Sequence, residues 1–176
     1  MKKILLIVLS LAVAVSISGC IGGGGNSLEG VNTADASAVT DVKYSDYEDN
    51  LAGLEEYLVA LKYIPEKAVP TDMMYAVIGA KDGDRYNFTV NGSAVYVELY
   101  EYDPTSLNDE GKRVISEIEE TGKFHVFQGD NENAAFEAEL SYNRKYMMIY
   151  TGDEKNDDLK NRKKEFIKAV KEFYKG

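Results

Sequence analysis

Apolar residues recur at helical intervals between residues 47 and 61, the first periodic segment after the N-terminal region. These residues are Tyr47, Leu51, Leu54, Leu58 and Leu61. Ser45 and Glu48 have the spacing of an N-terminal capping box, and Pro65 follows the pattern. We therefore predict a first helix that begins near Ser45 and ends at Pro65.

The segment 73–103 has the composition of three strands, with a tight turn in its second half. Asn91-Gly92 stands between two β-rich runs and supplies the two positive φ angles of a type I′ hairpin turn. The turn fixes a register in which Phe88 faces Val95, Tyr86 faces Val97, and Arg85 faces Glu98. We expect the apolar members of these pairs to share the core side of the sheet.

Two more helices and three short strands complete the predicted order. Pro104 stops the preceding strand, Thr105 or Ser106 can cap a helix, and Gly122 suits its end. Its inward stripe comprises Leu107, Gly111, Val114, Ile115 and Ile118. Strands are expected at 123–127, 134–142 and 145–151, with a turn at 143–144. An amphipathic helix follows from about residue 156, with a buried stripe of Leu159, Phe166, Ile167, Val170, Phe173 and Tyr174.

The predicted order is helix, three strands, helix, three strands, helix. Short connections favour antiparallel pairing, so we expect an α+β fold in which the helices pack on an antiparallel sheet. A strand hairpin followed by a helix occurs twice. The positions that match are Tyr96, Tyr100 and Asp103 with Tyr146, Tyr150 and Asp153. This suggests a duplicated ββα unit.

The N-terminus has the pattern of an export signal. Lys2 and Lys3 precede an apolar run from Ile4 to Val15, and small residues follow up to Gly19. This run is shorter than the roughly 20 residues that a spanning helix needs. We therefore expect residues 1–19 to be a removable signal peptide, with an uncleaved membrane anchor as the alternative.

The residues Ile17-Ser18-Gly19-Cys20 resemble the lipobox of membrane lipoproteins. The resemblance covers only the leader and the first mature residues. It implies that a diacylglycerol is attached to the sulfur of Cys20 and that this residue becomes the mature N-terminus. The following Gly-rich segment is similar to tethers of archaeal surface lipoproteins, and bacterial ones can look alike. The resemblance thus implies a lipid-anchored protein on the extracytoplasmic face of the cell membrane.

Composition divides the rest of the chain into a tether and one domain. Residues 20–43 are rich in Gly, Ala, Ser and Asp and lack periodicity, which is typical of a flexible linker. Residues 44–176 are long enough for one globular domain. Two of the 20 basic residues precede Cys20, which leaves 18 against 30 acidic ones, a net charge of −12. That charge repels phosphate backbones, so we exclude nucleic acid as a partner.

The usual catalytic and metal-binding residues are scarce. Cys20 is the only cysteine and His125 the only histidine, so a Cys/His zinc site cannot be built, and His125 is expected to be an ordinary strand residue. Asp82, Asp84 and Asn87 loosely resemble a calcium loop but lack the EF-hand pattern. Acidic side chains could still form the carboxylate pair of an exported hydrolase.

Tyrosines and surface polar groups suggest interactions instead. Five tyrosines alternate on two strands and could line a ligand groove or a protein contact, or lie under helices: Tyr96, Tyr100, Tyr102, Tyr146 and Tyr150. Asn87 and Asn91 each begin an N-glycosylation sequon. One stripe of the last helix could touch lipid headgroups or an acidic partner, or simply be solvated: Lys160, Lys164, Lys168, Lys171 and Lys175.

These observations favour a lipid-anchored binding module over an enzyme. Its partner would be a surface protein or a small ligand, and no cofactor is expected beyond the diacylglycerol on Cys20. The alternative is an exported hydrolase that uses paired carboxylates. Convergence of Asp and Glu side chains in one concave pocket, with perturbed pKa values, would favour the enzyme.

Overall fold

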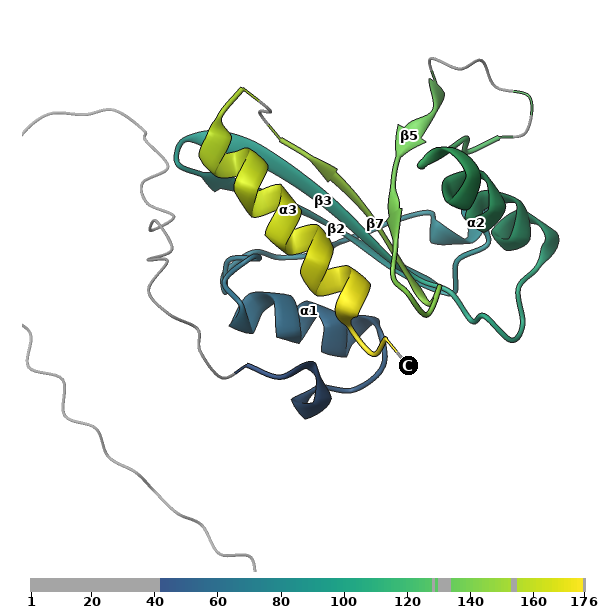
Figure 1. The fold of residues 1–176 in the computed structure, drawn as a ribbon, viewed down its shortest axis with the longest axis horizontal. Coiled ribbons are helices and arrows are strands. Elements are labelled where there is room, and N and C mark those ends of the chain that lie inside the picture. The colour runs from purple at the N-terminus through teal and green to yellow at the C-terminus, as the bar shows by residue number, and fades with distance from the viewer. Residues whose placement is uncertain (1–41, 128, 130–133, 153–154, 176) are drawn as a thin grey trace, which may run out of the picture. The chain divides into compact units, whose positions relative to one another are not determined.

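The computed structural model describes residues 42–127, 129, 134–152 and 155–175 (Figure 1). The predicted signal peptide, Cys20 and nearly all of the tether lie outside these residues. The described chain forms three α-helices, a five-stranded antiparallel sheet and a two-stranded sheet. The predicted α+β class is therefore confirmed.

The first half of the domain contains a 3-10 turn η1 (Tyr44–Asp46), α1 (Leu51–Ala60), β1 (Thr71–Asp72), a second 3-10 turn η2 (Tyr75–Ile78), β2 (Asp82–Val90) and β3 (Ser93–Glu101). The second half contains α2 (Asp109–Thr121), β4 (Lys123–Phe124), β5 (Phe136–Glu137), β6 (Glu139–Leu140), β7 (Tyr146–Thr151) and α3 (Asp157–Glu172). The main sheet has the strand order β1-β2-β3-β7-β6, and β4 pairs with β5 in the small sheet.

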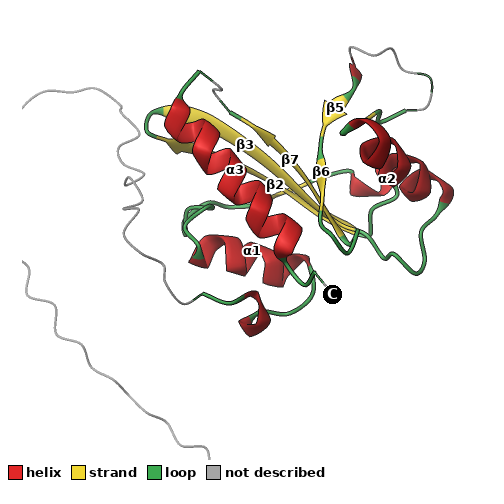
Figure 2. Ribbon diagram, viewed as in Figure 1, coloured by secondary structure: helices red, strands yellow, loops and turns green. Residues whose placement is uncertain are grey.

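Helices cover both faces of the main sheet (Figure 2). On one face, which we call the α3 face, Leu54 of α1 and Phe166 of α3 pack against Val97 of β3. On the other, the α2 face, Val114 and Ile118 of α2 pack in a second cluster with Tyr100 and Met147. Two hydrophobic clusters thus share the central strands β3 and β7, whereas the α2 face of the β2–β3 hairpin around Tyr96 is exposed.

The central hairpin has the predicted register. Phe88 lies opposite Val95, Tyr86 opposite Val97, and Arg85 opposite Glu98. Asn91 and Gly92 adopt φ angles of 50° and 81°, as a type I′ turn requires. The apolar members of these pairs are buried together on the α3 face.

The predicted starts of the first two helices are wrong. The N-cap of α1 is Asn50, whose side chain accepts a hydrogen bond from the Gly53 N–H, and Ser45 lies in η1 instead. The N-cap of α2 is Asn108 rather than Thr105 or Ser106. Short polar side chains near each helix could serve as caps, and tertiary packing decides which one does. Gly122 does end α2 in the left-handed conformation, as expected.

Three predicted strand segments also differ from the structure. The strand expected at 123–127 is only β4 (Lys123–Phe124), so His125 lies outside a strand. The expected strand before β2 is mostly the 3-10 turn η2, which ends at Gly79 with a φ of 72°. The expected strand over 134–142 is divided at Ala138, whose N–H donates to the Gly122 carbonyl. This bond holds the chain beside the end of α2, so β5 belongs to the small sheet and β6 to the main one.

The suggested duplication is not supported. The helix after β3 lies on the α2 face, whereas the helix after β7 lies on the opposite face. Combined with the strand order β2-β3-β7-β6, this gives the two ββα units opposite handedness. The matching Tyr100 and Tyr150 accordingly belong to different hydrophobic clusters.

Candidate functional site

The division at Ala138 leaves part of strand β7 without a neighbour. Strand β6 pairs with β7 only at Met147 and Met148. Two residues before Glu139, Glu137 pairs with Lys123 of β4 instead. Within the described residues, the outer edge of β7 from Ile149 to Thr151 therefore has no strand partner, and β5 diverges from it (Figure 1).

The pairing pattern shows which backbone groups face this open edge. The carbonyl of Tyr146 accepts from the Ser141 N–H on the β6 side, whereas the carbonyl of Lys145 accepts from the Tyr102 N–H on the β3 side. Backbone groups of successive residues in an antiparallel strand alternate between neighbours. The N–H and C=O of Tyr150 consequently point to the open edge.

Two cavities of about 230 Å³ each lie along this edge and share Tyr150, Lys163 and Ile167. The first is in the fork between β5–β6 and β7, and its other lining residues are Thr121, Gly122, Lys123, Glu137, Ala138, Glu139 and Met148. The second runs along α3, and its other lining residues are Gly152, Leu159, Lys160 and Lys164. We call the two together the β7 groove.

Charge is distributed unevenly along the β7 groove. Among the described residues, the second cavity is lined by three lysines and by no acidic side chain. In the first cavity, Glu139 pairs with Lys171 at 2.7 Å and Glu137 lies 3.9 Å from Lys123. The acidic side chains of the first cavity are thus paired with lysines, and the described charged residues that line the second cavity are all basic.

Tyr150 is the buried aromatic residue of the groove. Its ring packs edge-on against Phe166 at 5.5 Å, and the residue is only 7% exposed. Its hydroxyl is buried and has no hydrogen-bond partner among the described residues. Burial raises the pKa of Tyr150, so the hydroxyl stays protonated at neutral pH. A buried hydroxyl without a partner beside a cavity is costly unless something bonds to it.

The five predicted interaction tyrosines do not form one surface. Only Tyr96 is exposed, at 51%, and the other four are buried beneath helices. Tyr146 donates to Asp49 at 2.7 Å, and Tyr100 donates to Glu98 at 2.7 Å. The reason is that helices cover both faces of the sheet. Of the five, Tyr150 lines the groove.

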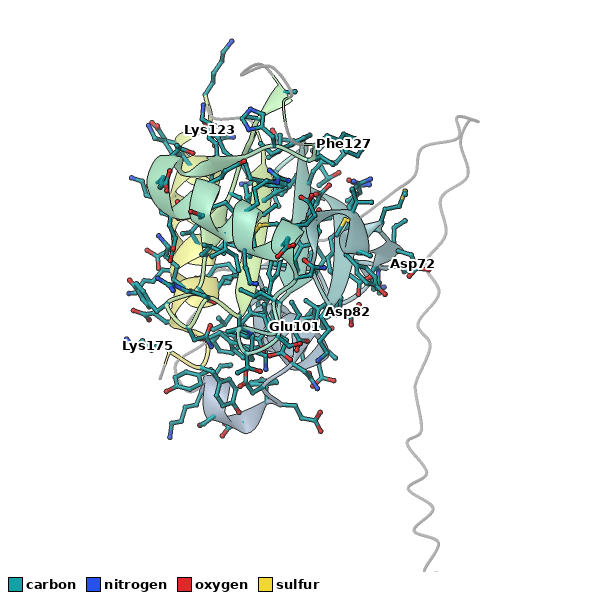
Figure 3. The ribbon with its side chains drawn as sticks, turned by 90° about the vertical axis from the view of Figure 1, so that its right-hand side faces the viewer. Asp72, Asp82, Glu101, Lys123, Phe127 and Lys175 are labelled. Carbon is teal, nitrogen blue, oxygen red and sulfur yellow. The ribbon has the colours of Figure 1, made fainter. Side chains whose placement is uncertain are left out.

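A second feature is an acidic corner around Glu55 of α1. Burial and the nearby Asp84 carboxylate raise the pKa of Glu55 to about 8, and Asp82 adds to the effect. Asp84 pairs across strands with Asp72, another acidic residue. Figure 3 shows Asp72 and Asp82 far from Lys123 of the groove. Neither Glu55 nor Asp84 lines the two cavities.

The proposed calcium ligands do not converge. Asp82 and Asp84 point to one side of β2, but Asn87 is at an odd position and points to the other. In the part of the chain that the structure describes, no group of three His, Cys, Asp or Glu side chains is arranged to hold a metal ion.

His125 belongs to a small polar cluster at the end of α2. Glu117 accepts the His125 backbone N–H at 2.9 Å, and its carboxylate lies 3.3 Å from His125 Nδ1. Arg113 binds Glu117 and also the His125 carbonyl. Burial alone would raise the pKa of Glu117, but these donors lower it. The cluster ties the segment after β4 to α2.

The two sequon asparagines, Asn87 and Asn91, are both exposed on the β2–β3 hairpin.

Comparison with models of protein families, with curated proteins and with solved structures finds no match to this chain. None of the helices among the described residues is long and apolar enough to span a bilayer. Function must therefore be argued from the groove itself.

Sequence reasoning missed the β7 groove. The sequence shows the stripe of lysines on α3, but it does not show which of these lysines lie beside a cavity. Lys160 and Lys164 line the groove, whereas Lys171 and Lys175 form ion pairs with Glu139 and Glu172. Ala138 gave no signal of the fork, because alanine at an inward position of an alternating run suggests an uninterrupted strand.

Proposed function

We propose that the protein is a lipid-anchored, extracytoplasmic binding module that receives a surface protein in the β7 groove. The observation that carries this proposal is the open edge of β7 beside a cavity lined by lysines and apolar side chains. Unpaired strand edges bind other chains readily, and folded proteins normally cover them. An uncovered edge next to a concave surface is therefore suited to a partner.

The anchor would contribute through local concentration. A diacylglycerol on Cys20 would hold the domain at the membrane, and residues 21–42 would act as a flexible tether of about 25 Å r.m.s. length. Binding of a partner in the same membrane would then occur at a high effective concentration. No cofactor is needed for this function.

The alternative, an exported carboxylate-dependent hydrolase, has one observation in its favour. Glu55 with a pKa of about 8 beside Asp84 is the kind of pair that can supply a general acid. A hydrolase also needs a concave site for its substrate at that pair. The two cavities of the β7 groove lie elsewhere, so the binding module is the better supported function.

Site-specific photo-crosslinking in cells that export and lipidate the chain tests the proposal. A photoreactive residue replaces Lys164 in the groove or, as a control, the exposed Lys112 on α2. We expect a discrete crosslinked protein from position 164 and none from position 112. The same cells with Cys20→Ser should lose the protein from the membrane fraction. Equal crosslinking at both positions, or none, would argue against the groove as a binding site.

A further inference from the structure

We infer that the occupant of the β7 groove is an extended segment of a partner protein that carries acidic residues at alternate positions and adds to β7 as a strand. This inference rests on the proposed function and specifies the chemistry of the partner. Three features of the groove support it: the length of the open edge, the spacing of the lysines and the character of the floor.

The open edge sets the conformation of the occupant. The outward N–H and C=O of Tyr150 are placed to pair with the backbone of a chain that lies in the plane of the sheet. From Ile149 to Thr151, with the adjoining Gly152, the open edge extends about 10 Å, which matches about three residues of extended chain. Strand addition of this length is a recurring mode of peptide recognition, in which main-chain hydrogen bonds supply much of the affinity.

The lysines of the groove determine the charge pattern that the bound peptide segment needs. Lys160 and Lys164 are one helical turn apart, about 6 Å along α3. Side chains at positions i and i+2 of a strand point to the same face and are about 7 Å apart. Two acidic residues at such positions would therefore face the two lysines at once. Both lysines are exposed, and no ion pair with another described residue engages them.

The floor of the groove favours a peptide over a membrane surface. Leu159, Ile167 and the ring of Tyr150 lie between α3 and the strand edge, and the Tyr150 hydroxyl has no partner there among the described residues. An extended chain can reach into this recess. A flat layer of lipid headgroups would meet the lysines but leave the edge of β7 and the recess empty.

The test uses synthetic peptides and the full lipidated chain held in nanodiscs of neutral lipid. The probe is fluorescein-labelled Val-Glu-Val-Glu-Val, capped at both ends. Its matched controls are Val-Lys-Val-Lys-Val and the acidic peptide with N-methylated backbone amides. We expect saturable binding of the acidic probe alone, weakened by salt because the attraction is between charges.

Variants locate the binding. Lys160→Glu/Lys164→Glu should weaken the affinity about tenfold or more, because two attractive pairs become repulsive. Lys67→Glu/Lys168→Glu makes the same change of net charge outside the groove and should have little effect. Hydrogen exchange of residues 149–152 should slow when the probe binds, as expected for a newly paired strand edge.

Several results would overturn the inference. Equal binding of the N-methylated peptide would show electrostatic docking without strand addition, and equal loss in both double variants would show a non-specific charge effect. Binding to anionic vesicles through Lys160 and Lys164, with no binding of the acidic probe, would assign the lysines to lipid. If the probe fails while position 164 still crosslinks a protein in cells, this partner chemistry is wrong but the proposed function stands. If both fail, the proposed function fails as well.

Discussion

The carboxylate of Glu101, at the end of β3, accepts a hydrogen bond from the backbone N–H of Leu51, the first residue of α1, at 2.8 Å. Glu101 is 3% exposed and also binds Lys81 Nζ at 2.9 Å. The first N–H groups of a helix have no partner within the helix. Glu101 satisfies one of them from 50 residues away and so joins α1 to the central strand of the sheet.

Removal of this carboxylate should destabilise the domain. We expect Glu101→Ala to lower the free energy of unfolding by about 2–3 kcal/mol, because the buried Leu51 N–H would lose its acceptor. Glu101→Gln keeps an oxygen for that bond and should cost less. Chemical denaturation of both variants measures the difference. An equal loss of unfolding free energy in both variants would show that the charge of Glu101 stabilises the domain and that its bond to Leu51 does not.

The acidic corner should make stability depend on pH. Burial and Asp84 raise the pKa of Glu55 from 4.5 to about 8, so the folded state holds a proton that the unfolded state releases above pH 4.5. Stability is therefore expected to fall as the pH rises from about 5 to 8. Glu55→Gln should flatten this decline and be the more stable protein at pH 8, by about 1–2 kcal/mol after allowance for solvent screening.

Denaturation curves of the two proteins between pH 5 and pH 9 test this expectation. Glu56→Gln removes one carboxylate from an exposed position of the same helix and serves as the control. The groups that face Glu55 are Asp82, Asp84 and Tyr86. An unchanged slope in Glu55→Gln would mean that another group of this cluster holds the proton.

Much of the fold was predictable because its signals are local. The Asn91-Gly92 turn fixes the register of β2 and β3 without help from the rest of the chain. The start of α3 is also set by local sequence, because Asn156 caps the helix directly before a clear amphipathic pattern. In these segments the local preference and the tertiary structure agree.

The remaining features depend on contacts that are distant in sequence. Ala138 leaves the main sheet because its N–H donates to the Gly122 carbonyl. The sequence around residue 138 contains no pattern that predicts this bond. Likewise, the tyrosines of β3 and β7 have the same spacing but face opposite sides of the sheet. The groove arises from both facts, so its residues could be noted individually from the sequence but not assembled into a site.

Two glycines with the same φ sign should respond very differently to alanine. Gly92 has a φ of 81° and open space around it, so Gly92→Ala should cost about 1–2 kcal/mol for the left-handed conformation alone. At Gly79, φ is 72° and an added Cβ would lie 2.3 Å from the Gly111 N and 2.4 Å from Asn108 Oδ1. Gly79→Ala must therefore displace the N-cap of α2, and we expect a loss of about 3 kcal/mol or more. Urea denaturation of the two variants measures the contrast. Similar losses would mean that η2 and α2 can separate at little cost.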